Sequence, residues 1–135
     1  MLTENDVVTA VSNYLIDKGY AIDQALTTSQ QGIDIVATHP VHGRCLVEAK
    51  GATSSKIASN RYGIEFNNNQ IKTHIGVAIL KSFQTIQLNK DAEVVIALPD
   101  NTGHRKIIDS MHFPIKKSGI NIFFVNDNMD VCIYK

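Results

Sequence analysis

The chain has 135 residues, of which 44% are apolar and 19% are charged, an ordinary globular composition that suffices for one sizeable core. Its formal net charge is zero, so the composition lacks the strong basic excess that is typical of non-specific DNA-binding proteins. No apolar stretch approaches the roughly 20 residues of a membrane-spanning helix, and the start is polar and acidic, unlike a secretory signal; we expect a cytoplasmic protein with one domain over residues 1–135.

The first predicted element is a helix over residues 4–18. Thr3 and Asp6 fit a capping box at its start, apolar residues recur at helical spacing, and Gly19 supplies the stop. Residues 20–27 alternate weakly between apolar and polar and predict a strand. Stronger strand patterns follow at residues 33–38 and 44–50, separated by a turn that contains Pro40 and Gly43.

The second half of the chain predicts another strong helix and three more strands. After an irregular segment at 51–69, residues 70–87 should form a helix whose buried stripe is Ile71, Ile75, Ile79, Phe83 and Ile86. Residues 93–98 suit a buried parallel strand, residues 105–111 a helix that ends before Pro114, and residues 120–125 and 131–134 two further strands. Both cysteines, Cys45 and Cys132, are predicted to be buried small hydrophobes. Strands flanked by helices predict an α/β sandwich.

The charges are unevenly distributed along the chain. Residues 1–43 carry five acids and one base, residues 44–81 carry six bases and two acids, and residues 82–135 carry six of each. One interpretation is a solvated surface with chance clustering. The other is a basic patch beside an acidic site, which suits phosphodiester cleavage because the bases contact phosphates and the acids hold a metal ion.

The strands at 33–38 and 44–50 bring three polar side chains together. Alternation places Asp34 on one face of the first strand, and Glu48 and Lys50 on one face of the second. In a hairpin centred on Val41, Asp34 faces Glu48 directly, because each lies seven residues from Val41. The Cβ atoms of facing residues in such a pair lie about 4.5–5.5 Å apart.

Two carboxylates this close repel each other unless a cation lies between them, and such oxygen ligands suit Mg²⁺, with Mn²⁺ as a substitute. The metal would polarise a phosphate and lower the pKa of a bound water. The Lys50 ammonium can orient that water or stabilise negative charge. Glu4, at the start of the first helix, could be a further metal ligand, and Gln70, at the start of the second strong helix, could orient Lys50 or the water.

The stretches 32–37 (GIDIVA) and 46–50 (LVEAK) resemble the PD-(D/E)XK nuclease superfamily, which includes restriction endonucleases and Holliday-junction resolvases. The resemblance implies a restriction-endonuclease-like fold, a central mixed sheet flanked by helices with an α-β-β-β-α-β core. It implies metal binding by Asp34, Glu48 and an acid of the first helix, Glu4, together with a catalytic Lys50 and a supporting polar residue, Gln70. One position departs from the pattern: the residue before Asp34 is Ile33, where the superfamily motif has proline. That proline is absent from many members of the superfamily.

The leading hypothesis is therefore a Mg²⁺-dependent endodeoxyribonuclease, with DNA as the expected partner. Lys56, Arg61 and Lys72 are candidate nucleic-acid contacts. A domain this small has little surface for recognising a long sequence, so we expect a homodimer or a partner subunit that supplies specificity.

Three alternatives stay open. The chain could be a catalytically inactive nucleic-acid-binding module of the same fold. It could be an interaction subunit that binds neither metal nor nucleic acid, which its zero net charge allows. Finally, Asp34, Glu48 and Lys50 could be the solvated face of an edge hairpin, joined by weak surface ion pairs.

Overall fold

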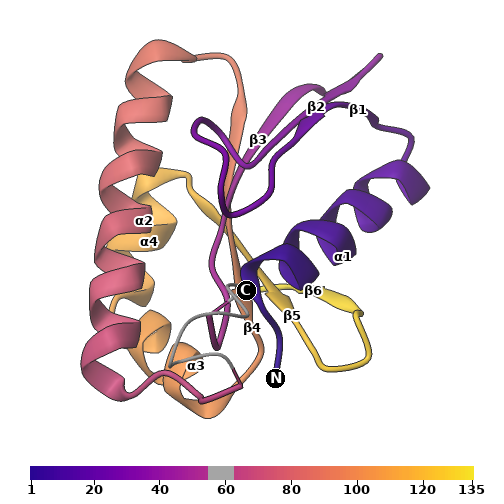
Figure 1. Cartoon of the computed structure of the whole chain (residues 1–135). Coiled ribbons are helices and arrows are strands. Elements are labelled where there is room, and N and C mark those ends of the chain that lie inside the picture. The colour runs from indigo at the N-terminus through magenta and orange to yellow at the C-terminus, as the bar shows by residue number, and fades with distance from the viewer. Residues whose placement is uncertain (55–62) are drawn as a thin grey trace.

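A six-stranded mixed sheet forms the centre of the computed structural model, which describes residues 1–54 and 63–135 (Figure 1). The strands are β1 Ala21–Ala25, β2 Ile35–His39, β3 Gly43–Ala49, β4 Glu93–Pro99, β5 Asn121–Val125 and β6 Val131–Ile133, and they lie in the sheet in chain order. The three central strands β3, β4 and β5 are parallel, whereas β1, β2 and β6 join antiparallel. The predicted mixed sheet is confirmed.

Helices cover both faces of this sheet in the described part of the chain. The helix α1 Glu4–Asp17 covers one face, and α2 Asn68–Leu88, α3 Thr102–Asp109 and α4 His112–Ser118 cover the other (Figure 1). The first six elements follow the predicted order α-β-β-β-α-β, so the α/β fold class is confirmed. None of the helices among the described residues has the length and apolarity needed to cross a membrane.

Strand alternation separates two cores, one under α1 and one under α2. On β2, Ile35 and Ala37 are fully buried beneath α1, where they meet Val47 of β3. The opposite core packs Ile96 of β4 and Phe124 of β5 against α2, α3 and α4. Successive side chains of a strand point to opposite faces of the sheet. A central strand such as β4 therefore contributes alternate residues to the core under α1 and to the core under α2.

Three sequence expectations differ from the structure. Phe83 is 52% exposed, and the buried residues of α2 are Ile71, Ile75, Ala78 and Ser82. Each step of four residues rotates a side chain about 40° beyond one full helical turn. After the three steps from Ile71 to Phe83, the rotation is about 120°, and Phe83 therefore no longer lies on the buried face. Cys132 is exposed because β6 is an edge strand. The helix predicted at 105–111 corresponds to α3 and ends before Pro114 as expected, but the further helix α4 was not predicted; Pro114 lies in its first turn, where proline costs no helical hydrogen bond.

The chain that leaves β3 packs tightly against the start of α1. The Ala52 amide donates to the Leu2 carbonyl oxygen at 2.7 Å, and Thr3 forms a parallel bridge with Thr53. Between these contacts, Gly51 lies so close to α1 that an added Cβ would be 2.7 Å from the carbonyl carbon of Thr3. Glycine is therefore required at position 51 for this approach.

We predict that Gly51→Ala lowers the free energy of unfolding by about 1–3 kcal/mol or more, because the new methyl group meets backbone that cannot move independently of α1. The matched control is Gly76→Ala in α2, where an added Cβ meets open space. That change should stabilise the protein by about 0.5–1 kcal/mol, since glycine is a poor helix former. Urea unfolding of both variants measures the difference, and equal effects would contradict the tight approach at Gly51.

Candidate active site

The β2–β3 hairpin places Asp34 opposite Glu48. The pairs run from His39 with Gly43 to Ile35 with Val47, and one further step along the same register pairs Asp34 with Glu48. The predicted hairpin register is therefore confirmed. Asp34 is 9% exposed and the Glu48 side chain 11% exposed, so these residues are not the solvated face of an edge hairpin.

Asp34 is held by the neighbouring strand. Its Oδ2 atom accepts a hydrogen bond of 2.8 Å from the Ala49 amide. This contact fixes one carboxylate oxygen of Asp34 at the carboxyl end of β3. Because the donor is a backbone group, the position of this side chain is set by the hairpin itself.

The paired carboxyl groups are electrostatically unfavourable when both are ionised. Burial raises the pKa of Glu48 above its ordinary value, and the negative charge of Asp34 raises it further. Burial also raises the pKa of Asp34. The Ala49 amide, the positive charges of Lys50 and of Lys81 on α2, and a hydrogen bond with the Glu48 carboxyl group oppose that rise. The two groups are thus close enough to interact directly, and both favour protonation or a bound cation.

Glu4 is brought to the same site by the tight packing at Gly51. It is the first residue of α1, and its pKa is raised mainly by burial and then by the negative charge of Asp34. The capping box of Thr3 and Asp6 begins the helix at this point. The fold therefore joins Glu4, Asp34 and Glu48 as three electrostatically coupled carboxyl groups.

Two lysines approach Glu48 from different elements. Lys50, just after β3, places its Nζ 3.6 Å from Glu48 Oε1, and its side chain is 15% exposed. Lys81 of α2 places its Nζ 3.5 Å from the same oxygen, and its side chain is 52% exposed. Lys50 was predicted from the sequence, whereas Lys81 was counted only among the basic residues, because its contact depends on how α2 packs over the hairpin.

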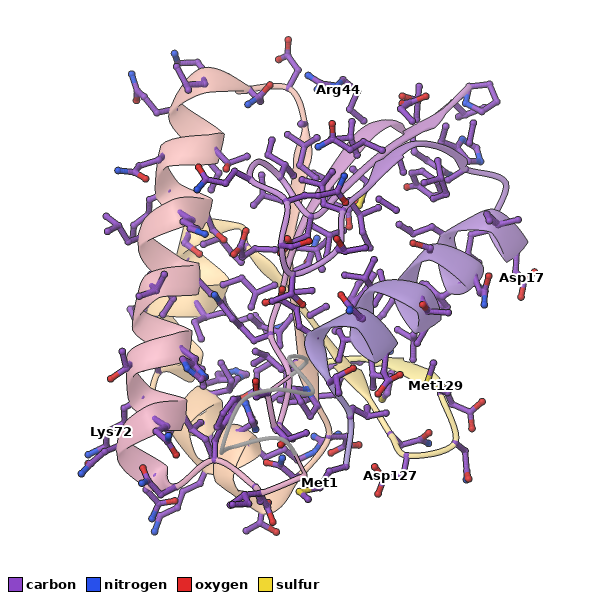
Figure 2. The ribbon with its side chains drawn as sticks, viewed as in Figure 1. Met1, Asp17, Arg44, Lys72, Asp127 and Met129 are labelled. Atoms are coloured by element: carbon purple, nitrogen blue, oxygen red, sulfur yellow. The ribbon has the colours of Figure 1, made fainter. Side chains whose placement is uncertain are left out.

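The remaining predicted site residues have different positions. Gln70 accepts a hydrogen bond of 2.8 Å from the Asn67 amide in the capping box of α2, so its described contacts serve the helix start and its role towards Lys50 stays a prediction. Lys72 is exposed near the amino end of α2 and points away from the sheet (Figure 2). Lys56 and Arg61 lie outside the described residues.

His74 is a further neighbour that sequence reasoning did not assign to the site. It lies on α2, and its pKa is lowered mainly by burial and then by the positive charge of Lys50. The ring of Phe66 meets it edge-on, with 4.5 Å between the ring centroids. A neutral His74 at neutral pH adds no further positive charge beside Lys50.

These charged groups line a cleft of about 570 Å³. Its other lining residues come from the β1–β2 loop, at positions 28 and 30–32. This loop is tied to α1 by Asn5, whose side-chain oxygen accepts a hydrogen bond of 3.1 Å from the Thr28 amide. The cleft thus combines acidic, basic and neutral polar walls.

The carboxyl groups of the cleft fit a hard divalent cation that keeps much of its water. Among residues 1–54 and 63–135, no group of three or more His, Cys, Asp or Glu side chains is arranged as a ready-made metal site. Mg²⁺, however, commonly uses only one or two protein carboxylates, with water and substrate phosphate as its remaining ligands. Asp34 and Glu48 supply that number, and a cation there would relieve their repulsion.

Comparison with known proteins shows a shared fold. The chain matches no family model and no curated protein. Two solved structures resemble it: an XisH family protein from Nostoc punctiforme PCC 73102, at 17% identity and a TM-score of 0.57, and an FdxN element excision controlling factor protein from Anabaena variabilis, at 20% identity and a TM-score of 0.56. Each alignment covers 96% of this chain and 97% of the other.

The raised pKa values predict how stability depends on pH. A carboxyl group whose pKa is raised by folding stabilises the native state at low pH, and this contribution is lost as pH rises through the raised value. Asp34→Asn removes one such group and keeps an oxygen that can accept from the Ala49 amide. We therefore expect the unfolding free energy of metal-free wild type to fall, relative to this variant, as pH rises from the ordinary carboxyl value towards 7.

Urea unfolding of wild type and Asp34→Asn across this pH range measures that difference. Asp91→Asn, an exposed turn variant, is the control and should follow wild type. A difference between wild type and Asp34→Asn that stayed constant with pH would show that Asp34 is not electrostatically strained.

Proposed function

We propose that this protein is a metal-dependent nuclease of the PD-(D/E)XK type that hydrolyses phosphodiester bonds in DNA as an endonuclease. The observation that carries the proposal is the largely buried pair Asp34 and Glu48, which face each other across a hairpin and have Lys50 beside them. Solvated surface residues would not place two carboxyl groups with raised pKa values together in a cleft.

Each side chain has a distinct task in this proposal. Asp34 and Glu48 would hold Mg²⁺, or Mn²⁺ in its place, with Glu4 as a further ligand or as an acceptor for a metal-bound water. The metal supplies polarisation of the phosphate and a lowered pKa of its water. Lys50, largely shielded from solvent, stabilises the negative charge that grows on the phosphate oxygens as water adds and the ester P–O bond breaks.

We propose DNA as the nucleic acid on which this chain acts. One structural neighbour is described as an excision controlling factor of the FdxN element, and excision of an element is an event on DNA. The role we propose for this chain is accordingly linked to DNA rearrangement. Lys72, exposed on α2, remains a proposed contact to the DNA backbone.

A second function is favoured by a specific observation. The same neighbour is described as a controlling factor, and such a protein can regulate an excision reaction without cutting DNA itself. The second candidate is therefore a DNA-binding or protein-interaction subunit of this fold that has no activity of its own. Retained DNA binding without cleavage in any divalent cation would distinguish it from the nuclease.

A homodimer stays part of the proposal, and the outer face of α2 is the surface we assign to it. Val77, Leu80 and Leu88 are 38%, 57% and 82% exposed, and the only charged residues of α2 are Lys72 and Lys81. We infer that two such faces pack through these exposed apolar side chains. Sedimentation over a wide range of concentrations should show a dimer that Leu80→Glu dissociates, and a monomer throughout would contradict this assignment.

The nuclease proposal predicts metal-dependent cleavage of DNA. Supercoiled plasmid and a branched DNA should be cut in Mg²⁺ or Mn²⁺, and the rate should fall at least about 100-fold in Asp34→Asn and in Lys50→Ala, because each loses a group that acts on the transition state. Gel assays of nicked and linear products measure the rate, and the preferred substrate defines the class of DNA structure that is cut.

Asp91→Asn is the matched control, since it removes an exposed carboxylate that does not line the cleft. Cleavage by Lys50→Ala at the wild-type rate would refute the proposed catalytic role. Absence of cleavage by wild type on both substrates, with metal and DNA still bound, would favour the regulatory subunit.

A further inference from the structure

We propose that Lys81 is the phosphate-binding cation of the cleft, a role that rests on the proposed function. In the metal-free protein this lysine pairs with Glu48, and in the metal-bound protein it is free to pair with a phosphodiester of the substrate. The ligand class is thus a phosphodiester anion, held beside the carboxyl pair by a residue of α2. Three observations lead to this assignment.

The first observation is the geometry at Glu48. Lys81 Nζ and Lys50 Nζ lie 3.5 Å and 3.6 Å from the same atom, Glu48 Oε1. One carboxylate oxygen therefore has two ammonium neighbours. A metal ion that takes this oxygen competes with both, and at least one ammonium group then needs another anion.

The second observation is exposure, which decides between the two lysines. The Lys50 side chain is 15% exposed, and its backbone amide is fixed by a hydrogen bond of 3.0 Å to the Ala97 carbonyl oxygen of the central sheet. The Lys81 side chain is 52% exposed and lines the mouth of the same cleft. A long, flexible side chain at this position can move from Glu48 to an incoming phosphate, whereas Lys50 stays beside the carboxyl pair.

The third observation is that α2 itself offers Lys81 no acidic partner. The helix contains no Asp or Glu, and the side chains one turn away on either side are Val77, Ala78, Gln84 and Thr85. An ordinary surface lysine on a helix often pairs with an acid at this spacing. Lys81 instead pairs across to Glu48, which is largely buried within the cleft.

The charge balance of the cleft supports the same conclusion. When all its groups are ionised, three carboxylates and two ammonium groups leave one net negative charge. A divalent cation changes that to one net positive charge, which a single phosphodiester anion neutralises. Without Lys81 the metal-bound cleft would be neutral and would attract the anion less strongly.

Two binding measurements test Lys81, and they should move in opposite directions. Lys81→Gln should bind Mn²⁺ about threefold or more tightly by isothermal titration, because a competing ammonium group has been removed from Glu48. In a Lys50→Gln background, which prevents cleavage, the same change should weaken binding of a duplex oligonucleotide in Mn²⁺. The slope of log affinity against log salt should also fall by about 0.9, the value for one lost phosphate contact.

Lys106→Gln is the matched control, since Lys106 is an exposed lysine of α3 outside the cleft. It should leave the Mn²⁺ affinity unchanged and retain the duplex affinity and salt slope. Lys81→Arg should preserve the salt slope because it keeps the charge. Thermal unfolding of each variant checks that the fold is intact.

The possible failures can be told apart. If Lys81→Gln weakens Mn²⁺ and duplex binding together, or changes neither, Lys81 is a structural or ordinary surface residue and the inference is overturned. If wild type binds Mn²⁺ and cuts DNA in that case, the proposed function still holds. A wild type that binds neither Mn²⁺ nor duplex overturns the proposed function and this inference with it.

Discussion

Two carboxyl groups that face each other across a hairpin, both shielded from water, impose a requirement on the surrounding structure. Burial raises the pKa of both Asp34 and Glu48, and the negative charge of Asp34 raises the pKa of Glu48 further. A backbone amide meets Asp34, and two ammonium groups approach Glu48. The site is therefore organised around negative charge that the protein compensates only in part, the condition in which a divalent cation binds most favourably.

Close backbone packing brings the supporting elements to this charge. Glu4 reaches the pair only because α1 begins against the chain that leaves β3, and Gly51 permits that approach. A capping box sets the first residue of α1, and the hairpin register sets Asp34 against Glu48. Local backbone geometry thus positions the acids, and the more exposed Lys81 side chain approaches them from α2. A site built in this way would hold the proposed ligands in place before any metal binds.

Local patterns predicted those features that depend on short distances along the chain. Alternation and an odd turn centred on Val41 were enough to pair Asp34 with Glu48, and the Thr3 capping box placed the start of α1. Features that depend on how distant elements pack were missed or wrong. Lys81 meets Glu48 from a position 33 residues away, and no local rule indicates that contact. Phe83 was wrongly predicted to be buried, because residues spaced four apart rotate progressively around a helix.

The zero net charge of the chain also gains a physical meaning from the site. Attraction to DNA over long distances is strengthened by an excess of positive charge. This chain has 13 bases and 13 acids and therefore no such excess. Short-range attraction is different, because it depends on the few charges within a Debye length of about 8–10 Å. A cation held by Asp34 and Glu48 would reverse the sign of that local field. Binding of nucleic acid would then depend on prior binding of metal, and a protein of this kind would hold DNA weakly until its site is loaded.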